Sequence, residues 1–170
     1  HGTRTVGGSI SIEVSLRDGF GNPGSGTVSW KLIEPLPSAA SLSATSTTIA
    51  GSASTILTIG TKTGQYQVLA QVNGYTATFT ITAEQGAITT ILPMSIPATA
   101  TVNTTLRLRV ELYDLYGNPA VAAVDWQAQG MPATTTQTIN GTATLESTPG
   151  TRSGVYGATA SCGGRIATFT

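Results

Sequence analysis

The side chains that most often carry catalysis are scarce in this chain. Its one histidine is His1, the first residue, and its one cysteine is Cys162. A Ser-His-Asp or Cys-His nucleophile needs a histidine as base, and a structural zinc site needs several Cys or His ligands. No glycine-rich phosphate loop precedes a helical pattern. The sequence therefore predicts a protein that is not an enzyme and holds no organic cofactor.

Acidic residues offer one further kind of chemistry, the binding of calcium. Asp18 and Asp114 hold matching places in two similar turns, and Glu84 lies where one similar half of the sequence gives way to the other. Carboxylates and turn carbonyls are calcium ligands, but calcium sites gather several carboxylates and only 8 Asp and Glu are present. We therefore expect each Asp to cap its own turn by accepting backbone N–H bonds, with calcium as the alternative.

The composition of the chain limits the kinds of partner that it is expected to bind. Charged residues make up 9% of the chain and its net charge is zero, against about 25% charged residues in ordinary soluble domains. The absence of a basic cluster argues against a nucleic-acid partner, and the absence of an apolar run of about 18 residues argues against membrane insertion. Cys162 is expected to pack as a small buried hydrophobe, with an intermolecular disulfide or reactive thiol as the alternative.

The sequence contains an internal repeat, and most of the residues named above lie within it. Residues 14–30 read VSLRDGFGNPGSGTVSW, and residues 110–126 read VELYDLYGNPAVAAVDW without a gap between them. The match resumes where residues 64–80 (GQYQVLAQVNGYTATFT) align with residues 154–170 (GVYGATASCGGRIATFT). A period near 90 residues is too long for a solenoid repeat and fits a whole small domain. The sequence therefore predicts two copies of one domain in tandem.

The predicted domains are residues 1–84 and 85–170. The second copy opens with residues 86–97 (GAITTILPMSIP), which read as its first strand, whereas the first copy has no counterpart because His1 aligns with Pro97. Two explanations stay open. The chain is a segment of a longer array, or domain 1 lacks its first strand and its open sheet edge accepts a strand from a neighbouring copy.

Each copy has the residue pattern of half-buried β-strands. Ile10, Ile12, Val14 and Leu16 alternate with polar residues, and no stretch has helical periodicity. The predicted strands are residues 9–16, 27–34, 53–59, 65–72 and 75–83 in the first copy and 122–128 in the second. Short alternating strands separated by Gly, Pro and Asn predict an all-β fold of two tandem immunoglobulin-like antiparallel β-sandwiches.

Two turns and two aromatic positions recur in both copies. The glycine of each GNP turn is expected to supply a positive φ and its proline to end the turn, while Trp and Tyr fill a core position and a tyrosine corner. The residues expected to carry the fold are Gly21, Asn22, Pro23, Trp30 and Tyr66 in the first copy and Gly117, Asn118, Pro119, Trp126 and Tyr156 in the second. Phe20 and Tyr116, at the turn tips, are expected to be exposed and to form an interface.

The chain resembles the bacterial Ig-like domains of the invasin/intimin type. The resemblance rests on D-x-x-G-N-P, a core aromatic residue, G-x-A, and G-x-Y before a closing T-F, once per copy. It implies an Ig-like sandwich that serves as a rod segment in surface-exposed bacterial proteins. The adhesive activity of that family resides in terminal lectin-like modules, and both copies here resemble plain spacer domains.

These observations predict a non-enzymatic spacer module at the cell surface or outside the cell. Its expected partners are further Ig-like domains or copies of itself. One alternative is a filament subunit completed by strand donation from a neighbouring copy. Another is a module that binds a surface glycan or a host receptor, or that decorates a virion.

Overall fold

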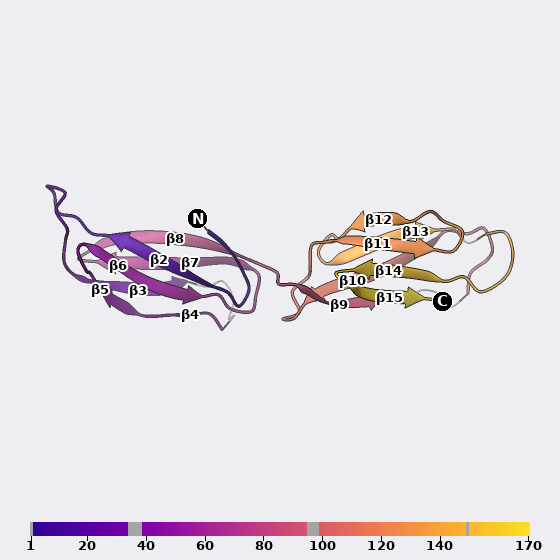
Figure 1. Cartoon of the computed structure of the whole chain (residues 1–170), viewed down its shortest axis with the longest axis horizontal. Coiled ribbons are helices and arrows are strands. Elements are labelled where there is room, and N and C mark those ends of the chain that lie inside the picture. Colours follow the sequence, from indigo (N-terminus) through magenta and orange to yellow (C-terminus); the bar gives the residue numbers. More distant parts are fainter. Residues whose placement is uncertain (1, 34–38, 95–98, 149) are drawn as a thin grey trace. The chain divides into compact units, whose positions relative to one another are not determined.

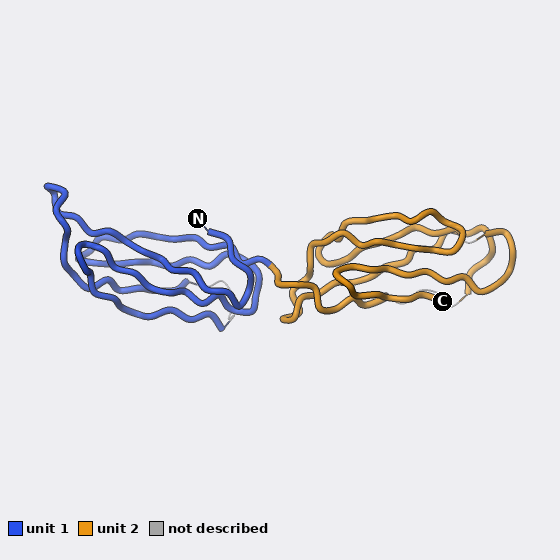
Figure 2. Tube along the Cα trace, viewed as in Figure 1, with its two compact units in different colours: residues 1–84 blue, residues 85–170 orange. Residues whose placement is uncertain are grey.

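The computed structural model describes residues 2–33, 39–94, 99–148 and 150–170. Strands are the regular elements of this described part, which contains no helix, so the all-β prediction is confirmed and no helix there could cross a membrane. The chain divides into two compact units, His1–Glu84 (unit 1) and Gln85–Thr170 (unit 2) (Figure 2). The boundary falls where strand β8 ends.

Unit 1 is a sandwich of two sheets (Figure 1). Its strands are β1 (Gly2–Thr5), β2 (Ser9–Ser15), β3 (Thr27–Ile33), β4 (Ser41–Leu42), β5 (Thr45–Thr47), β6 (Ser52–Thr58), β7 (Gly64–Val72) and β8 (Tyr75–Glu84). One sheet has the order β1-β8-β7-β3-β5 and the other β2-β6-β4. Ile12 and Leu57 from the smaller sheet share a core with Val28, Trp30 and Val68 from the larger one.

Unit 2 has the same two-layer arrangement (Figure 1). Its strands are β9 (Ile88–Pro93), β10 (Leu106–Asp114), β11 (Ala123–Ala128), β12 (Thr134–Gln137), β13 (Thr142–Ser147), β14 (Ala158–Cys162) and β15 (Arg165–Phe169). The sheets have the orders β13-β10-β9 and β12-β11-β14-β15. Val110 and Leu112 meet Val124, Trp126 and Phe169 in the core between them.

The strands form where side chains alternate between core and solvent. In β3 the burial pattern is strictly alternating, with Val28 and Trp30 inward and their neighbours exposed. Each fully buried Val or Leu contributes about 1.5–3 kcal/mol relative to an exposed one. Pairing fixes the register, since Trp30 lies opposite Ala70 of β7 and a shift by one residue would turn its ring to solvent.

Two features of unit 1 depart from a simple antiparallel sandwich. Strand β1 runs parallel to β8, with Gly2 opposite Ile81 and Thr5 opposite Glu84, whereas the other described strand pairs of unit 1 are antiparallel. Within the described residues β2 pairs with β6, whereas β10 of unit 2 pairs with both β13 and β9. The segment expected at residues 86–97 appears as β9, and Pro97 and Glu34 lie outside the described residues.

Candidate functional site

The GNP turn of unit 2 is organised around the carboxylate of Asp114. Its Oδ1 accepts the backbone N–H groups of Tyr116 at 2.8 Å and Asn118 at 2.9 Å. Its Oδ2 accepts the Asn118 side-chain amide and the Gly86 backbone N–H, both at 2.9 Å. Asp114 is 2% exposed. Four N–H donors therefore surround a buried carboxylate and stabilise its charge.

The matching turn of unit 1 repeats three of these four bonds. Asp18 Oδ1 accepts the N–H groups of Phe20 and Asn22 at 2.9 Å, and Oδ2 accepts the Asn22 side-chain amide at 3.0 Å. Asp18 is exposed. The structure describes no counterpart of the Gly86 bond in this turn, so the same local motif is solvated in one unit and buried in the other.

The turn backbone requires its glycine. Gly21 has a φ of 86° and Gly117 one of 77°, in the left-handed region that other residues enter at a cost of about 1–2 kcal/mol. Each glycine N–H donates to the carbonyl of the Asp that opens its turn, at 3.0 and 3.1 Å. The residues singled out from the sequence are thus brought together as two closed turns.

The hydrogen bonding of these turns argues against the alternative of a calcium site. Each oxygen of Asp114 accepts two N–H bonds, which occupy the lone pairs that a cation would use. Glu84 is an exposed residue at the end of β8. The described residues contain no group of three or more His, Cys, Asp or Glu side chains able to hold a metal. The geometry favours turn capping for both aspartates.

Hydrogen bonding lowers the pKa of both aspartates. Burial raises the pKa of Asp114, but the bonds from the Asn118 side chain and from the Gly86, Asn118 and Tyr116 backbones outweigh it and hold the pKa below its ordinary value. The Asn22 side-chain bond, followed by backbone bonds from Asn22 and Phe20, lowers the pKa of Asp18. Each carboxylate is therefore more acidic in the folded than in the unfolded protein.

We expect stability to fall in acid as these two groups are protonated. Because both folded pKa values lie below the unfolded value of about 3.9, the aspartates contribute their full stabilisation above that pH and lose it as the pH falls through the folded values. Urea unfolding from pH 7 to pH 2.5 measures this loss. The Asp18→Asn/Asp114→Asn double variant should show a shallower decline, and an unchanged slope would assign the acid sensitivity to other groups.

The segment that opens unit 2 is bonded to the rest of that unit. Gly86 donates to Asp114, and the Gln85 side-chain amide donates to the Val121 carbonyl at 3.3 Å. Strand β8 ends at Glu84 and β9 begins at Ile88, so two of the three intervening residues are held in this way. These bonds span 28 and 36 residues, and no local sequence pattern signals them.

The recurring tryptophans are structural. The Trp30 Nε1–H donates to Ser46 Oγ, and the Trp126 Nε1–H donates to Thr136 Oγ1, both at 2.8 Å. Their exposed fractions are 4% and 1%. Trp126 also stacks on Phe169 with ring centroids 6.0 Å apart. Neither indole offers a face to a ligand such as a sugar.

The recurring tyrosines close two identical corners. Tyr66 donates its hydroxyl to the Lys62 carbonyl at 2.8 Å, and Tyr156 donates to the Arg152 carbonyl at 2.7 Å. In both cases the acceptor lies four residues upstream. This is the arrangement of a tyrosine corner, which fixes the entry into the next strand.

Removal of either tyrosine hydroxyl should destabilise its own unit. Tyr66→Phe is expected to lower the free energy of unfolding by about 1–1.5 kcal/mol, since the bond is lost and a partly buried carbonyl is left without its donor. Tyr156→Phe should have the smaller effect, because Tyr156 is the more exposed of the two. Urea denaturation checks this order, and a larger loss for Tyr156→Phe would contradict it.

A second glycine of each copy has a role that the sequence motif did not reveal. Gly141 has a φ of 77°, and a Cβ there would lie 2.8 Å from Pro119 Cβ and 3.0 Å from the Leu112 carbonyl oxygen. Gly51 lies in the same way against Pro23. The glycine of G-x-A therefore lets the chain pass closely beneath the GNP turn. The Asn-Gly dipeptide at 140–141 signals a tight turn but not this contact.

The sequence analysis also singled out Phe20, Tyr116 and Cys162. Phe20 is 94% exposed and Tyr116 is 40% exposed at the turn tips, so both are accessible, and their role as an interface stays a prediction. Cys162 packs partly buried against the core of unit 2. Burial and the charge of Asp125 raise the pKa of its thiol, which favours the protonated form over the nucleophilic thiolate.

Comparisons with known proteins give a likeness of fold. No family model and no curated protein matches the chain. Among solved structures, it is similar to the D0-D1 domain of intimin, with 19% identity over 94% of this chain and 85% of that one and a TM-score of 0.42. Invasin, described as a bacterial integrin-binding protein, gives 23% identity over 98% of this chain and 36% of that one, with a TM-score of 0.46.

A third neighbour is the adhesin InvE of Yersinia pseudotuberculosis, with 18% identity over 98% of this chain and 54% of that one and a TM-score of 0.47. This chain thus spans about a third of the invasin structure and about half of the InvE structure. The sequence analysis noted a resemblance to domains of the invasin/intimin type, and intimin and invasin are the proteins that give this type its name. Each unit is thus an all-β sandwich of the immunoglobulin-like kind that the sequence predicted, and the likeness to these structures is one of fold.

Proposed function

We propose that the chain is a non-enzymatic structural spacer of a surface or extracellular protein, built to hold its length under tension. The observation that carries this proposal is the parallel pairing of β1 with β8. Among the described strands of unit 1, these are the first and the last along the chain. When the two ends of unit 1 are pulled apart, parallel end strands slide along each other, so their hydrogen bonds are loaded together instead of one after another.

The use of the recurring polar groups supports the same proposal. The aspartates, the indole N–H groups and the corner hydroxyls all bond within their own units. Within the described residues no buried side-chain N or O atom lacks a hydrogen-bond partner. An active site usually holds polar groups in reserve for a substrate, and these recurring groups are already used by the fold.

Single-molecule stretching between the two chain ends tests the proposal. We expect two unfolding steps, each releasing about 300 Å of chain at about 3.3–3.6 Å per residue. Unit 1 should unfold at the higher force because it has the parallel end-strand pair. Unfolding of both units at forces too low to give separate steps would overturn the proposal.

Two substitutions to proline, one on each side of β1, give a test variant and its matched control. The Val6 N–H donates to the Glu84 carbonyl, so the two-residue period of a strand directs the Arg4 N–H toward β8 and the Thr3 N–H away from it. Arg4→Pro should lower the unfolding force of unit 1, and Thr3→Pro should lower it less. Equal effects would show that β1 does not carry the load.

A second candidate function is strand donation between copies, and it is favoured by the side of β2 on which no described residue forms a paired strand. In unit 2, β9 covers this side of the sandwich, and Ile88 and Ile91 pack against the core. In unit 1, Phe79 is half-buried, whereas the matching Phe169 is 5% exposed. Electron microscopy of the native material distinguishes the candidates, because a regular fibre requires strand donation or another propagating contact.

A further inference from the structure

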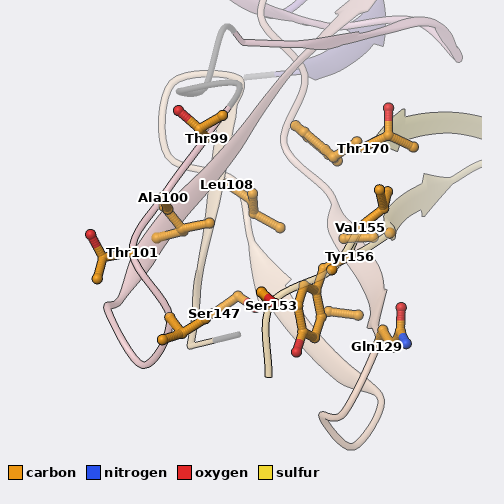
Figure 3. Close-up of a pocket in the computed structure, with 17 residues that line it drawn as sticks. Thr99, Ala100, Thr101, Leu108, Gln129, Ser147, Ser153, Val155, Tyr156 and Thr170 are labelled. Atoms are coloured by element: carbon orange, nitrogen blue, oxygen red, sulfur yellow. The ribbon is translucent and has the colours of Figure 1, made fainter. Parts of the chain in front are cut away.

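The hollow in unit 2 shown in Figure 3 has few reactive side chains. Among the described residues that line it, such as Leu108, Gln129 and Tyr156, none is charged and none is His or Cys. A reactive group of another kind lies in two turns. The dipeptide Asn-Gly occurs at residues 73–74 in unit 1 and at residues 140–141 in unit 2. Because glycine has no Cβ, its backbone nitrogen is unhindered and can attack the asparagine side chain.

The reaction is the formation of a succinimide, and water is its only other reactant. A bond forms between the glycine backbone nitrogen and the asparagine Cγ, and the Cγ–Nδ2 bond breaks. Ammonia leaves with the proton of the glycine N–H. Water then opens the ring at either carbonyl, which gives aspartate or, where the main chain now runs through the side chain, isoaspartate. Each event replaces an uncharged amide with a carboxylate.

Both asparagines lie in the same type of turn. The two central residues have φ values of 47° and 84° in the turn of residues 72–75, and of 49° and 77° in the turn of residues 139–142. Positive φ at both central positions defines a type I′ turn, and the flanking residues of each turn pair with each other. Asn73 and Asn140 are both exposed. Neither the turn type nor the access of water therefore separates the two sites.

The turns differ in how firmly their glycine is held. The Gly141 carbonyl accepts the Leu112 N–H at 2.8 Å, and a Cβ on Gly141 would lie 2.8 Å from Pro119 Cβ. A Cβ on Gly74 would meet no described atom within 4 Å. The turn of residues 139–142 is therefore packed against the GNP turn, whereas the turn of residues 72–75 has free space around its glycine.

This difference matters because the succinimide ring cannot close in a type I′ turn. The ring needs the asparagine Cβ and the glycine nitrogen to be nearly eclipsed about the Cα–C bond, and the left-handed backbone of the turn holds them apart. The glycine amide must therefore rotate before it reacts. Rotation at Gly74 requires only local opening of a hairpin tip, whereas rotation at Gly141 breaks its bond to Leu112 and its contact with Pro119.

We propose that Asn73 is a site of spontaneous deamidation and isoaspartate formation in the folded protein, and that Asn140 is protected by the packing of its turn. The product at Asn73 adds a negative charge to a chain whose net charge is zero. This inference does not rest on the proposed spacer function. It concerns a covalent change that the folded chain undergoes with water alone.

The internal repeat supplies matched positions for a test. By the alignment of the copies, residues 50–51 (Ala-Gly) correspond to 140–141, and residues 163–164 (Gly-Gly) correspond to 73–74. The Gly51 carbonyl accepts the Leu16 N–H at 2.6 Å, so this turn is held like its counterpart in unit 2. A Cβ on Gly164 would meet no described atom within 4 Å. Each unit thus has one held turn and one free turn.

The test places asparagine in the two turns that lack it. Ala50→Asn creates an Asn-Gly dipeptide in the held turn of unit 1, and Gly163→Asn creates one in the free turn of unit 2. Both positions already have positive φ, at 49° and 58° or less, which asparagine tolerates. The parent and the two variants are incubated as full chains at neutral pH, both folded and in urea. Peptide mass spectrometry measures conversion at each site, and enzymatic methylation of isoaspartate measures that product.

In urea we expect all the Asn-Gly sites to react at similar rates, because the turns are absent. In the folded chains, Asn73 and the Gly163→Asn site should react at least about tenfold faster than Asn140 and the Ala50→Asn site. Equal rates at Asn73 and Asn140 in the folded parent would overturn the proposal. Rates that follow the unit instead of the turn would also overturn it, since packing of the turn would then not be the cause.

Discussion

Asp114→Ala is expected to destabilise unit 2 by about 3 kcal/mol. The substitution leaves four N–H donors without their acceptor at a buried position, and each unsatisfied buried donor costs about 1–3 kcal/mol before relaxation. Asp18→Ala removes a similar set of bonds at an exposed turn, where water replaces the carboxylate, so its effect should be clearly smaller. Urea denaturation of the two variants measures the difference.

The fluorescence of one tryptophan per unit separates the two transitions. Trp30 reports on unit 1 and Trp126 on unit 2, so each variant is also made with the tryptophan of the unaltered unit replaced by phenylalanine.

Asp114→Asn is the second control. Its oxygen can still accept two bonds, but its NH₂ group would face the Gly86 and Asn118 donors, so it should recover only part of the loss. Equal losses for Asp18→Ala and Asp114→Ala would contradict the role assigned to burial.

Gly141→Ala is expected to destabilise unit 2 by about 2–3 kcal/mol. Part of this cost is the left-handed backbone that alanine resists, and part is the contact of the new Cβ with Pro119 and the Leu112 carbonyl. Gly154→Ala is the matched control, since a Cβ there meets nothing within 4 Å. Thermal unfolding of the two variants gives the comparison.

The same measurement tests the role of the repeat. Gly51→Ala should destabilise unit 1 by a comparable amount, because its Cβ would meet Pro23 and the Leu16 carbonyl at 3.0 Å. A Gly141→Ala variant as stable as the parent would show that the turn can move away from the strand beneath it. The close approach would then not be a requirement of the fold.

Sequence predicts the fold where side chains alternate and the pairing is local. Strand β3 has the bounds expected for it up to the end of the described segment, and the carboxylate of each turn bonds to residues two and four positions ahead. Local patterns of this kind depend on a few neighbouring residues. They therefore appear in the sequence as clearly as in the structure.

Features created by distant pairing were not predictable in this way. Strand β1 has one half-buried residue followed by three exposed ones, so it lacks alternation, and only its pairing with β8 makes it a strand. Strand β12 is almost entirely threonine and gives no periodic signal. The bond from Gly86 to Asp114 joins residues 28 positions apart.

The central claim is that the recurring polar residues are used by the fold and are not held for a ligand. Calcium titration of the full chain, followed by thermal unfolding, tests it most directly. The oxygen lone pairs of the Asp114 carboxylate already accept four N–H bonds. We therefore expect the Tm of both units to be the same in millimolar calcium and in chelator. A calcium-dependent rise in Tm that Asp114→Ala abolishes would contradict the account and make the turn a metal site.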